Sequence, residues 1–161
     1  MSALPPDDQR YLARAVTLSR HHMKSGQGGP FGAVIARDGG ILAEGWNRVT
    51  STNDPTAHAE IVAIRRACRR IKAFSLEGAT LYTSCEPCPM CLAAAYWARL
   101  SRIVYANTRE DAAAIGFDDA LIYEEFPKPA SERIIPTFHA PTSDASAVFA
   151  EWLGKADRVR Y

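Results

Sequence analysis

The sequence predicts an α/β fold, a three-layer α/β sandwich. Two observations lead to it. Runs with helical periodicity alternate with short β-rich runs in the order α-β-β-α-β-α-β-α, and one helix lies between two strands as in a right-handed βαβ crossover. With 161 residues, 47% of them hydrophobic, the chain can bury one core, so we expect a single domain over residues 1–161.

The first third of the chain predicts a helix and a β-hairpin. The helix is expected over Asp7–Lys24, and the glycine-rich segment Gly26–Pro30 is expected to be a turn, since it lacks the Gly-Lys-Ser/Thr ending of a phosphate loop. Two strands, Phe31–Arg37 and Ile41–Trp46, flank a turn that favours positive φ. One face of the helix is expected to carry Leu12, Val16, Ser19 and Met23.

The middle third predicts a loop, two helices and two strands. Asn47–Pro55 is polar and indicates a loop, and a helix is expected over Thr56–Phe74. A strand over Ala79–Ser84, a helix over Pro89–Leu100 and a strand over Arg102–Ala106 follow. The apolar positions of the first of these helices are Ala57, Ile61, Ile64, Cys68 and Ile71.

The last third is less regular. Asp111–Glu125 is expected to be helical in part and broken at Gly116, and a proline-rich connection follows, with Ile134–His139 extended. A last amphipathic helix is expected over Ser143–Lys155.

Composition restricts the classes of function. The formal net charge of +1 argues against a strongly cationic polynucleotide binder, so no nucleic-acid partner is expected. The start, Met1–Asp8, does not resemble a signal peptide, and the densest apolar run, Leu92–Ala98, is too short to span a membrane. Four cysteines without a secretory signal favour metal binding or free thiols over disulfides. We expect a soluble, cytoplasmic protein.

Two short motifs carry the chemistry. His58 and Glu60 form H-x-E, and Cys88 and Cys91 form P-C-x-x-C, and the combination is similar to the signature of zinc-dependent nucleobase deaminases. One imidazole and two thiolates supply three Zn²⁺ ligands, so the fourth position stays open for water. The carboxylate of Glu60 can then move protons.

Both motifs are expected in the first turn of a helix. The positive end of the helix dipole favours thiolate at Cys88 and Cys91 and a neutral imidazole at His58. Because the cysteines are three residues apart, they lie on one helical face.

Other interpretations of single residues compete. His58 alone is typical of a hydrogen-bonded core histidine, Cys88 and Cys91 alone of a structural zinc site, and Cys85 with Cys88 of a redox pair. The joint motif favours catalytic zinc over all three, and Cys85 is then expected to be a buried thiol beside the ligands.

Longer stretches extend the similarity over nearly the whole chain. The sequence resembles the bacterial guanine deaminases of the cytidine deaminase-like superfamily, which implies a three-layer α/β/α sandwich with a mixed five-stranded sheet. The stretches that carry the resemblance are Gly28–Ile35, Asn53–Glu60, Ser84–Cys91, Gly116–Asp119 and the terminal Tyr161.

The resemblance implies roles for particular residues. His58, Cys88 and Cys91 would hold zinc, Glu60 would shuttle protons, and Asp119 would be a second acid that helps the amine depart. The residues assigned to the substrate, a small purine base, are Asn47, Phe31, Ala59, Trp97 and Tyr161.

Without the resemblance, Asp119 is typical of a helix start and Trp97 of a core. The resemblance also implies a homodimer that exchanges its C-terminal helix and tail, residues 142–161, so that Tyr161 closes the partner's pocket.

Alternatives in function remain open. The chain could deaminate guanosine, cytosine or the aminotriazine ammeline, because pocket shape decides the substrate. An adenosine deaminase that edits tRNA is disfavoured by the near-neutral charge. A non-catalytic zinc module is disfavoured by Glu60 and by the open fourth position.

Overall fold

The computed structural model describes residues 4–161, and residues 1–3 of the expected domain lie outside the described residues. The chain forms two compact units, one up to Asp119 and one over Ala120–Tyr161, and each is described by itself. The single domain with an exchanged C-terminal segment stays a prediction.

The first unit contains a mixed sheet. Its strands are β1 (Gly32–Arg37), β2 (Gly40–Trp46), β3 (Thr80–Cys85) and β4 (Arg102–Asn107), in the order β2-β1-β3-β4. β1 pairs antiparallel with β2 and β3, and β3 pairs parallel with β4. The mixed sheet and the crossover are therefore confirmed. The expected fifth strand is wrong, since the sheet formed by residues 4–161 has four.

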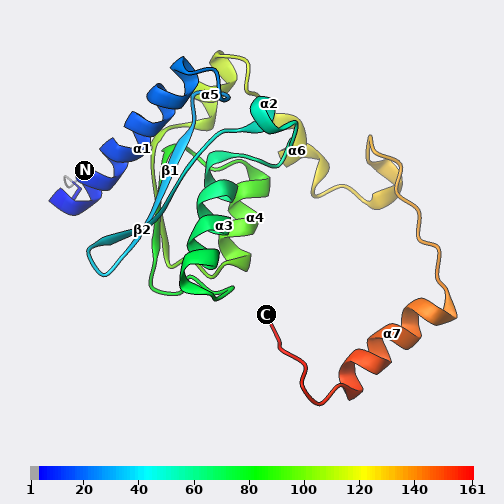
Figure 1. Cartoon of the computed structure of the whole chain (residues 1–161). Helices are drawn as coiled ribbons and strands as arrows, with labels where there is room; N and C mark the ends of the chain where they lie inside the picture. Colours follow the sequence, from blue (N-terminus) through cyan, green and yellow to red (C-terminus); the bar gives the residue numbers. More distant parts are fainter. Residues whose placement is uncertain (1–3) are drawn as a thin grey trace. The chain divides into compact units, whose positions relative to one another are not determined.

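Helices cover both faces of this sheet (Figure 1). On one face α1 (Pro6–Lys24) packs against β1 and β3, and on the other lie α3 (Ala59–Ile71) and α4 (Pro89–Trp97). Alternation along β1 divides its side chains between two cores, because successive strand residues point to opposite faces. Val34 and Ala36 join the core beside α1, whereas Ala33 and Ile35 join the core beside α3. The three-layer architecture is confirmed.

The buried face of α1 agrees with the expected one in part, since Ser19 is buried and Leu12 is half-buried against the core, but Met23 is not. Tyr11, Ala15 and Leu18 are buried, whereas Met23 is 42% exposed. The backbone explains the shift, since a Cβ at Gly32 would lie 2.3 Å from the carbonyl oxygen of Ala15. Because Gly32 has no side chain, the face of α1 that contains Ala15 can approach the sheet closely.

Both helices that carry the motifs end earlier than expected, and α3 also begins three residues later, whereas α4 begins at Pro89 as expected. Both α3 and α4 begin directly after the first ligand residue of their motif, at Ala59 and Pro89. Lys72 and Arg99 have φ of 54° and 55° just beyond the helix ends, and such left-handed residues terminate helices. The expected loop after β2 contains a short helix, α2 (Val49–Thr52).

The last part of the first unit contains α5 (Arg109–Ala114), which begins at a capping box formed by Thr108 and Asp111. The expected break at Gly116 is confirmed by its φ of 92°.

The second unit contains α6 (Ala120–Glu125), a 3₁₀ turn (Ala130–Glu132) and α7 (Ser143–Gly154). None of these elements has a buried residue. Residues 134–139 form no strand, and Pro136 among them lacks the N–H that a sheet ladder needs. Within residues 4–161, no helix combines the length and apolarity needed to cross a membrane.

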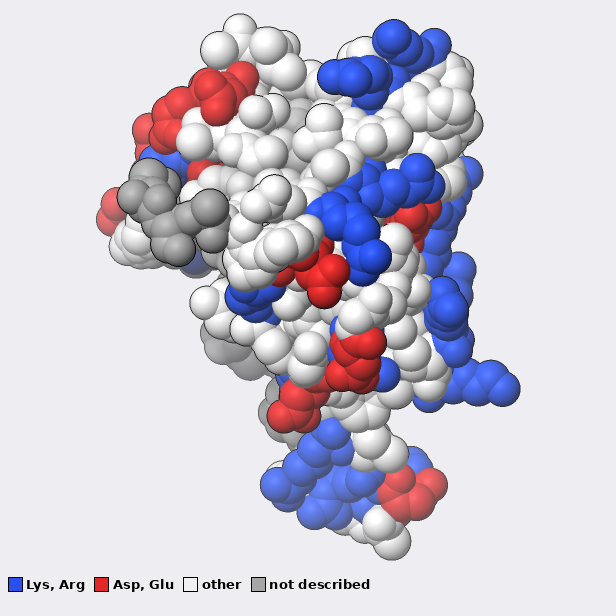
Figure 2. All heavy atoms as spheres, turned by 90° about the vertical axis from the view of Figure 1, so that its left-hand side faces the viewer, with Lys and Arg blue, Asp and Glu red and all other residues white. Residues whose placement is uncertain are grey.

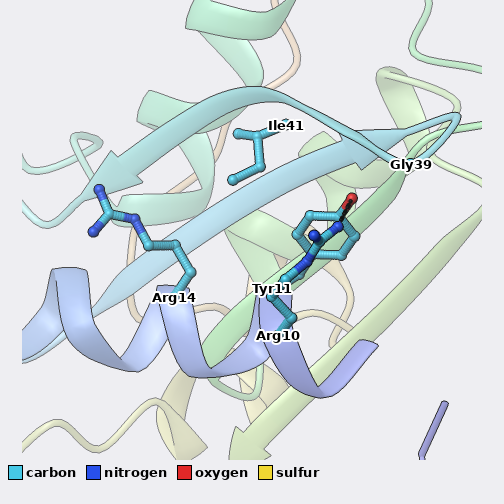
Figure 3. Close-up of a pocket in the computed structure, with 5 residues that line it drawn as sticks. All are labelled: Arg10, Tyr11, Arg14, Gly39 and Ile41. Atoms are coloured by element: carbon cyan, nitrogen blue, oxygen red, sulfur yellow. Dashed lines mark hydrogen bonds between the residues drawn. The ribbon is translucent and has the colours of Figure 1, made fainter. Parts of the chain in front are cut away.

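One surface hollow of about 420 Å³ lies beside α1 and the turn between β1 and β2, lined by Arg10, Tyr11, Arg14, Gly39 and Ile41 (Figure 3). Arg14 is held there by Glu44, at 2.7 Å and 2.9 Å. The hollow is on the α1 side of the sheet, whereas the predicted zinc ligands are at the starts of α3 and α4 on the other side.

Candidate metal centre

Three side chains meet where α3 and α4 begin. His58 Nδ1 lies 3.5 Å from Cys88 Sγ and 3.6 Å from Cys91 Sγ, and the three ligand atoms all lie within 4.8 Å of one another. A tetrahedral zinc, with bonds of about 2.0–2.1 Å to nitrogen and about 2.3 Å to sulfur, separates these two ligand types by about 3.6 Å. The three residues therefore fit zinc and leave one coordination position for a water molecule.

Local backbone geometry creates this cluster. His58 and Cys88 are the N-cap residues of their helices, in extended conformations, so their side chains project from the helix ends. Pro89 fixes the first position of α4, and Cys91 follows in its first turn, completely buried. Helix α3 is held close to β2, since a Cβ at Gly45 would lie 2.1 Å from the Ala59 carbonyl oxygen.

The electrostatics of the metal-free cluster differ from those expected from the helix dipoles. Contact with Cys91, together with His58, holds the pKa of Cys88 down to about 4. The Cys88 thiolate and burial raise the pKa of Cys91, and the bond to Cys88 also raises that of His58. The expected thiolate is thus favoured only at Cys88. Without metal the cluster tends to keep protons on His58 and Cys91, which zinc must displace.

Glu60 lies in the first turn of α3, two residues after His58, and is only 6% exposed. Burial raises the pKa of its carboxyl group, and the nearby Cys88 raises it further. Burial thus favours the protonated carboxyl group, so Glu60 holds a proton more readily than an exposed glutamate does. Cys85 is buried too, and desolvation raises the pKa of its thiol to about 11, so it is not a ready thiolate.

The loop before β1 lies against the end of β2. Asn47 is buried, and its Oδ1 accepts hydrogen bonds from the backbone N–H groups of Gly29 and Val49, both at 3.2 Å. Both lone pairs of this oxygen are used, so Asn47 offers a substrate its Nδ2 donors. Phe31 follows the loop, and its ring meets that of Phe117 edge-to-face at 4.9 Å between centroids.

Asp119 is half-buried, and burial followed by the nearby Cys88 raises its pKa. The structure thus brings Asp119 into electrostatic range of the zinc cluster. Ala59 lies between His58 and Glu60 but is fully buried in the core.

Trp97 does not lie at the zinc cluster. Trp97 is the last residue of α4, roughly 9 Å along the helix axis from Cys91. It is 67% exposed, so the alternative of a core aromatic is wrong. Tyr161 belongs to the second unit.

Sequence reasoning gave Phe117 no role of its own. Its ring lies on Phe31, and a Cβ at Gly29 would be 3.1 Å from it. Phe117 lies in the Gly116–Asp119 stretch that carries the resemblance, and this is the feature of the sequence that points to it.

Comparisons with known proteins agree with this site. Residues 5–107 match the family model of the cytidine and deoxycytidylate deaminase zinc-binding region. Guanine deaminase from Bacillus subtilis is 52% identical over 95% of this chain and 98% of its own. Its crystal structure matches with a TM-score of 0.93 over the same shares of both chains.

Two more distant relatives are informative. The structure of guanine deaminase from Nitrosomonas europaea is 31% identical, has a TM-score of 0.67, and matches over 81% of this chain and 71% of its own. A tRNA-specific adenosine deaminase from Aquifex aeolicus is 31% identical over 78% of this chain and 81% of its own.

Proposed function

The chain belongs to the cytidine and deoxycytidylate deaminase family, and we propose that it converts guanine and water to xanthine and ammonia. The observation that carries this proposal is the 52% identity to a guanine deaminase over 95% of the chain. That similarity includes the second unit, beyond the zinc-binding region that ends at residue 107.

The proposed zinc ligands are His58 Nδ1 and the Sγ atoms of Cys88 and Cys91. Zinc bound in such a site lowers the pKa of a coordinated water toward neutrality and so provides a nucleophile. His58 can then keep its proton on Nε2, the tautomer that ligation through Nδ1 requires.

Glu60 is the proposed general base and acid. Its buried carboxylate accepts a proton from the attacking water, which adds to C2 of guanine, the carbon that bears the amino group. Guanine already carries a proton on N1, so Glu60 delivers its proton to N3, the other ring nitrogen next to C2. The raised pKa favours this role, because it makes the Glu60 carboxylate a stronger base and lets the carboxyl group hold the proton between the two transfers.

Asp119 and two residues near the glycine loop are proposed to serve the base itself. Asp119, with its raised pKa, protonates the amino nitrogen, ammonia leaves as the C2–N bond breaks and C2=O forms, and the proton of the added hydroxyl group returns to Asp119. Asn47 donates from Nδ2 to the acceptor edge of the purine, and Phe31 stacks on the ring.

The remaining assignments concern two further substrate contacts, the homodimer and the location in the cell. Ala59 and Trp97 are proposed to contact the substrate, Ala59 through its place between His58 and Glu60. Tyr161 is proposed to close the pocket of a second copy in a homodimer that exchanges residues 142–161. We also propose that the protein acts in the cytoplasm.

A second candidate is adenosine deamination in tRNA, which the similarity to the Aquifex aeolicus enzyme favours. Against it stands the net charge of +1, because binding to nucleic acid depends on many phosphate contacts. The face in Figure 2 carries acidic as well as basic side chains.

Ammonia release tests the proposal. Zinc-loaded protein would be offered guanine, guanosine, cytosine, adenine, ammeline and a tRNA anticodon stem-loop in parallel. We expect turnover of guanine and none of guanosine. Turnover of another base would retain the zinc chemistry and reject the proposed pocket, and turnover of the stem-loop alone would establish the second candidate.

A further inference from the structure

Trp46, the last residue of β2, holds the glycine loop through a side-chain hydrogen bond. Its indole Nε1–H donates to Gln27 Oε1 at 2.7 Å. The next residue of the chain, Asn47, holds the same loop at Gly29 N. Two consecutive residues at the end of one strand therefore bind the loop at positions two residues apart.

The indole ring is fixed in direction. His22 stacks on it with centroids 3.7 Å apart and planes 7° apart, and the guanidinium of Arg66 lies 4.3 Å from its centroid. Because the parallel imidazole covers one face, the guanidinium occupies the other. An indole ring that is packed on both faces keeps one orientation, so its N–H stays directed at Gln27 Oε1.

The loop needs such a tether. Gly26 has a φ of 74°, and Gly28 and Gly29 follow Gln27, so the free backbone has many conformations to lose. The ordered loop packs tightly, since a Cβ at Gly28 would lie 2.3 Å from the Asn47 carbonyl oxygen. It leads directly into Phe31, whose N–H donates to Gly29 O at 2.8 Å.

We propose that Trp46 is a positioning residue for the purine site: through Gln27 it holds the loop so that Asn47 and Phe31 keep the geometry that binds the base. The proposal rests on the proposed function, which assigns Asn47 and Phe31 to the substrate. The proposal assigns Trp46 no contact with the substrate or with the zinc ligands.

Gln27 variants test the proposal without altering the indole. Gln27→Leu removes the acceptor, whereas Gln27→Glu retains an oxygen that Trp46 can reach. We expect Gln27→Leu to raise KM for guanine about three- to tenfold, the range of one hydrogen bond, with kcat within about twofold. Gln27→Glu should restore most of the KM. Gln9→Leu, at the other end of α1, is the matched control and should change neither constant.

Amide hydrogen exchange of residues 26–31 in zinc-loaded, substrate-free protein supplies a readout independent of turnover. Gln27→Leu and Trp46→Phe should both accelerate exchange about three- to tenfold, and Gln27→Glu should not. Unchanged exchange in Gln27→Leu would overturn the tether. Faster exchange with an unchanged KM would overturn the positioning role. If the wild-type protein does not deaminate guanine while amide exchange changes as expected, the proposed function is wrong and the tether of the loop by Trp46 is supported.

Discussion

Glu60 sits in an environment that few carboxyl groups in proteins occupy. It is 6% exposed, lies two residues from a zinc ligand, and has a pKa raised chiefly by burial. Taking a carboxylate out of water destabilises the fold, so a carboxyl group buried to this degree is expected to have a function that requires it. Proton transfer beside the proposed zinc site is a function of this kind.

Replacing Glu60 with glutamine should abolish turnover and spare the metal. The amide has nearly the same shape but cannot accept and return a proton, so we expect kcat to fall by about 100- to 10,000-fold. Zinc content, measured by atomic emission, should match that of the wild-type protein because Glu60 is not one of the three proposed ligands. A near-wild-type rate would reject the role of Glu60.

Two of the cysteines near the site, Cys91 and Cys85, should respond differently to replacement by serine. Cys91→Ser removes a proposed zinc ligand and should lose most of the metal. Cys85→Ser is the matched control, since the Cys85 thiol bonds to the backbone oxygen of Thr108 at 3.4 Å and is not part of the cluster. It should retain zinc. Metal loss in both variants, or in neither, would contradict the ligand set.

For single residues, the sequence predicts the contacts between side chains that are only a few positions apart in the chain. His58 and Glu60 are two residues apart and Cys88 and Cys91 three apart, so a helix start brings each pair together. The contacts of Asn47 with Gly29 and of Trp46 with Gln27 could not be predicted in this way. They join residues 18 and 19 positions apart through a loop that has no periodicity.

Among the elements, α1 shows how a buried polar residue can fix a helix on a sheet. Asp8 is 4% exposed and accepts hydrogen bonds from Tyr82 on β3, at 2.7 Å, and from Arg102 on β4. Its second oxygen is buried with no hydrogen-bond partner in the described part of the chain. The pattern of apolar residues alone could not reveal this contact, because an acidic residue near a helix start is usually assigned to the dipole.

Asp8→Asn should destabilise the fold at neutral pH. The hydrogen bonds from Arg102 and Tyr82 lower the pKa of Asp8. Its contribution is therefore complete above the unfolded-state pKa of about 3.9 and is lost as pH falls through the lower folded-state value. We expect a loss of about 1–2 kcal/mol in the free energy of unfolding at pH 7.

Urea titrations at pH 7, 4 and 3 measure this difference. The gap between variant and wild type should be constant from pH 7 down to about pH 5 and should shrink at lower pH. A gap of the same size at pH 3 as at pH 7 would show that the charge of Asp8 is not the cause.

The order and type of the strands and of the long helices in the first unit are predictable because their apolar periods differ clearly, whereas the short helix α2 has no such period. The crossover rule gives the parallel β3–β4 pair. The expected fifth strand is wrong: residues 134–139 are the one further run expected to be extended, and an extended run that contains a proline does not imply a pairing partner. Helix ends were displaced by Lys72 and Arg99, since nothing in a lysine or arginine marks a left-handed conformation.

For the whole molecule, the second unit raises the question of what it packs against. Helix α7 contains Val148, Phe149, Trp152 and Leu153 and has no buried residue. A helix with so much apolar surface gains stability by association. This agrees with the proposed homodimer.

Light scattering coupled to size exclusion should give a mass twice the 17.6 kDa of one chain. Phe149→Glu, on α7, should shift that mass toward the monomer, whereas Glu151→Lys on the same helix should not. A monomer in the wild-type protein at micromolar concentration would contradict the exchange of residues 142–161.

The most direct test of the account is xanthine formation from guanine by zinc-loaded protein, by the same protein after chelation, and after zinc is returned. The family and the three clustered ligands predict that turnover falls in proportion to the zinc removed and recovers when zinc is restored. Guanine turnover that persists without zinc, or a zinc-loaded protein that leaves guanine unchanged, would contradict it.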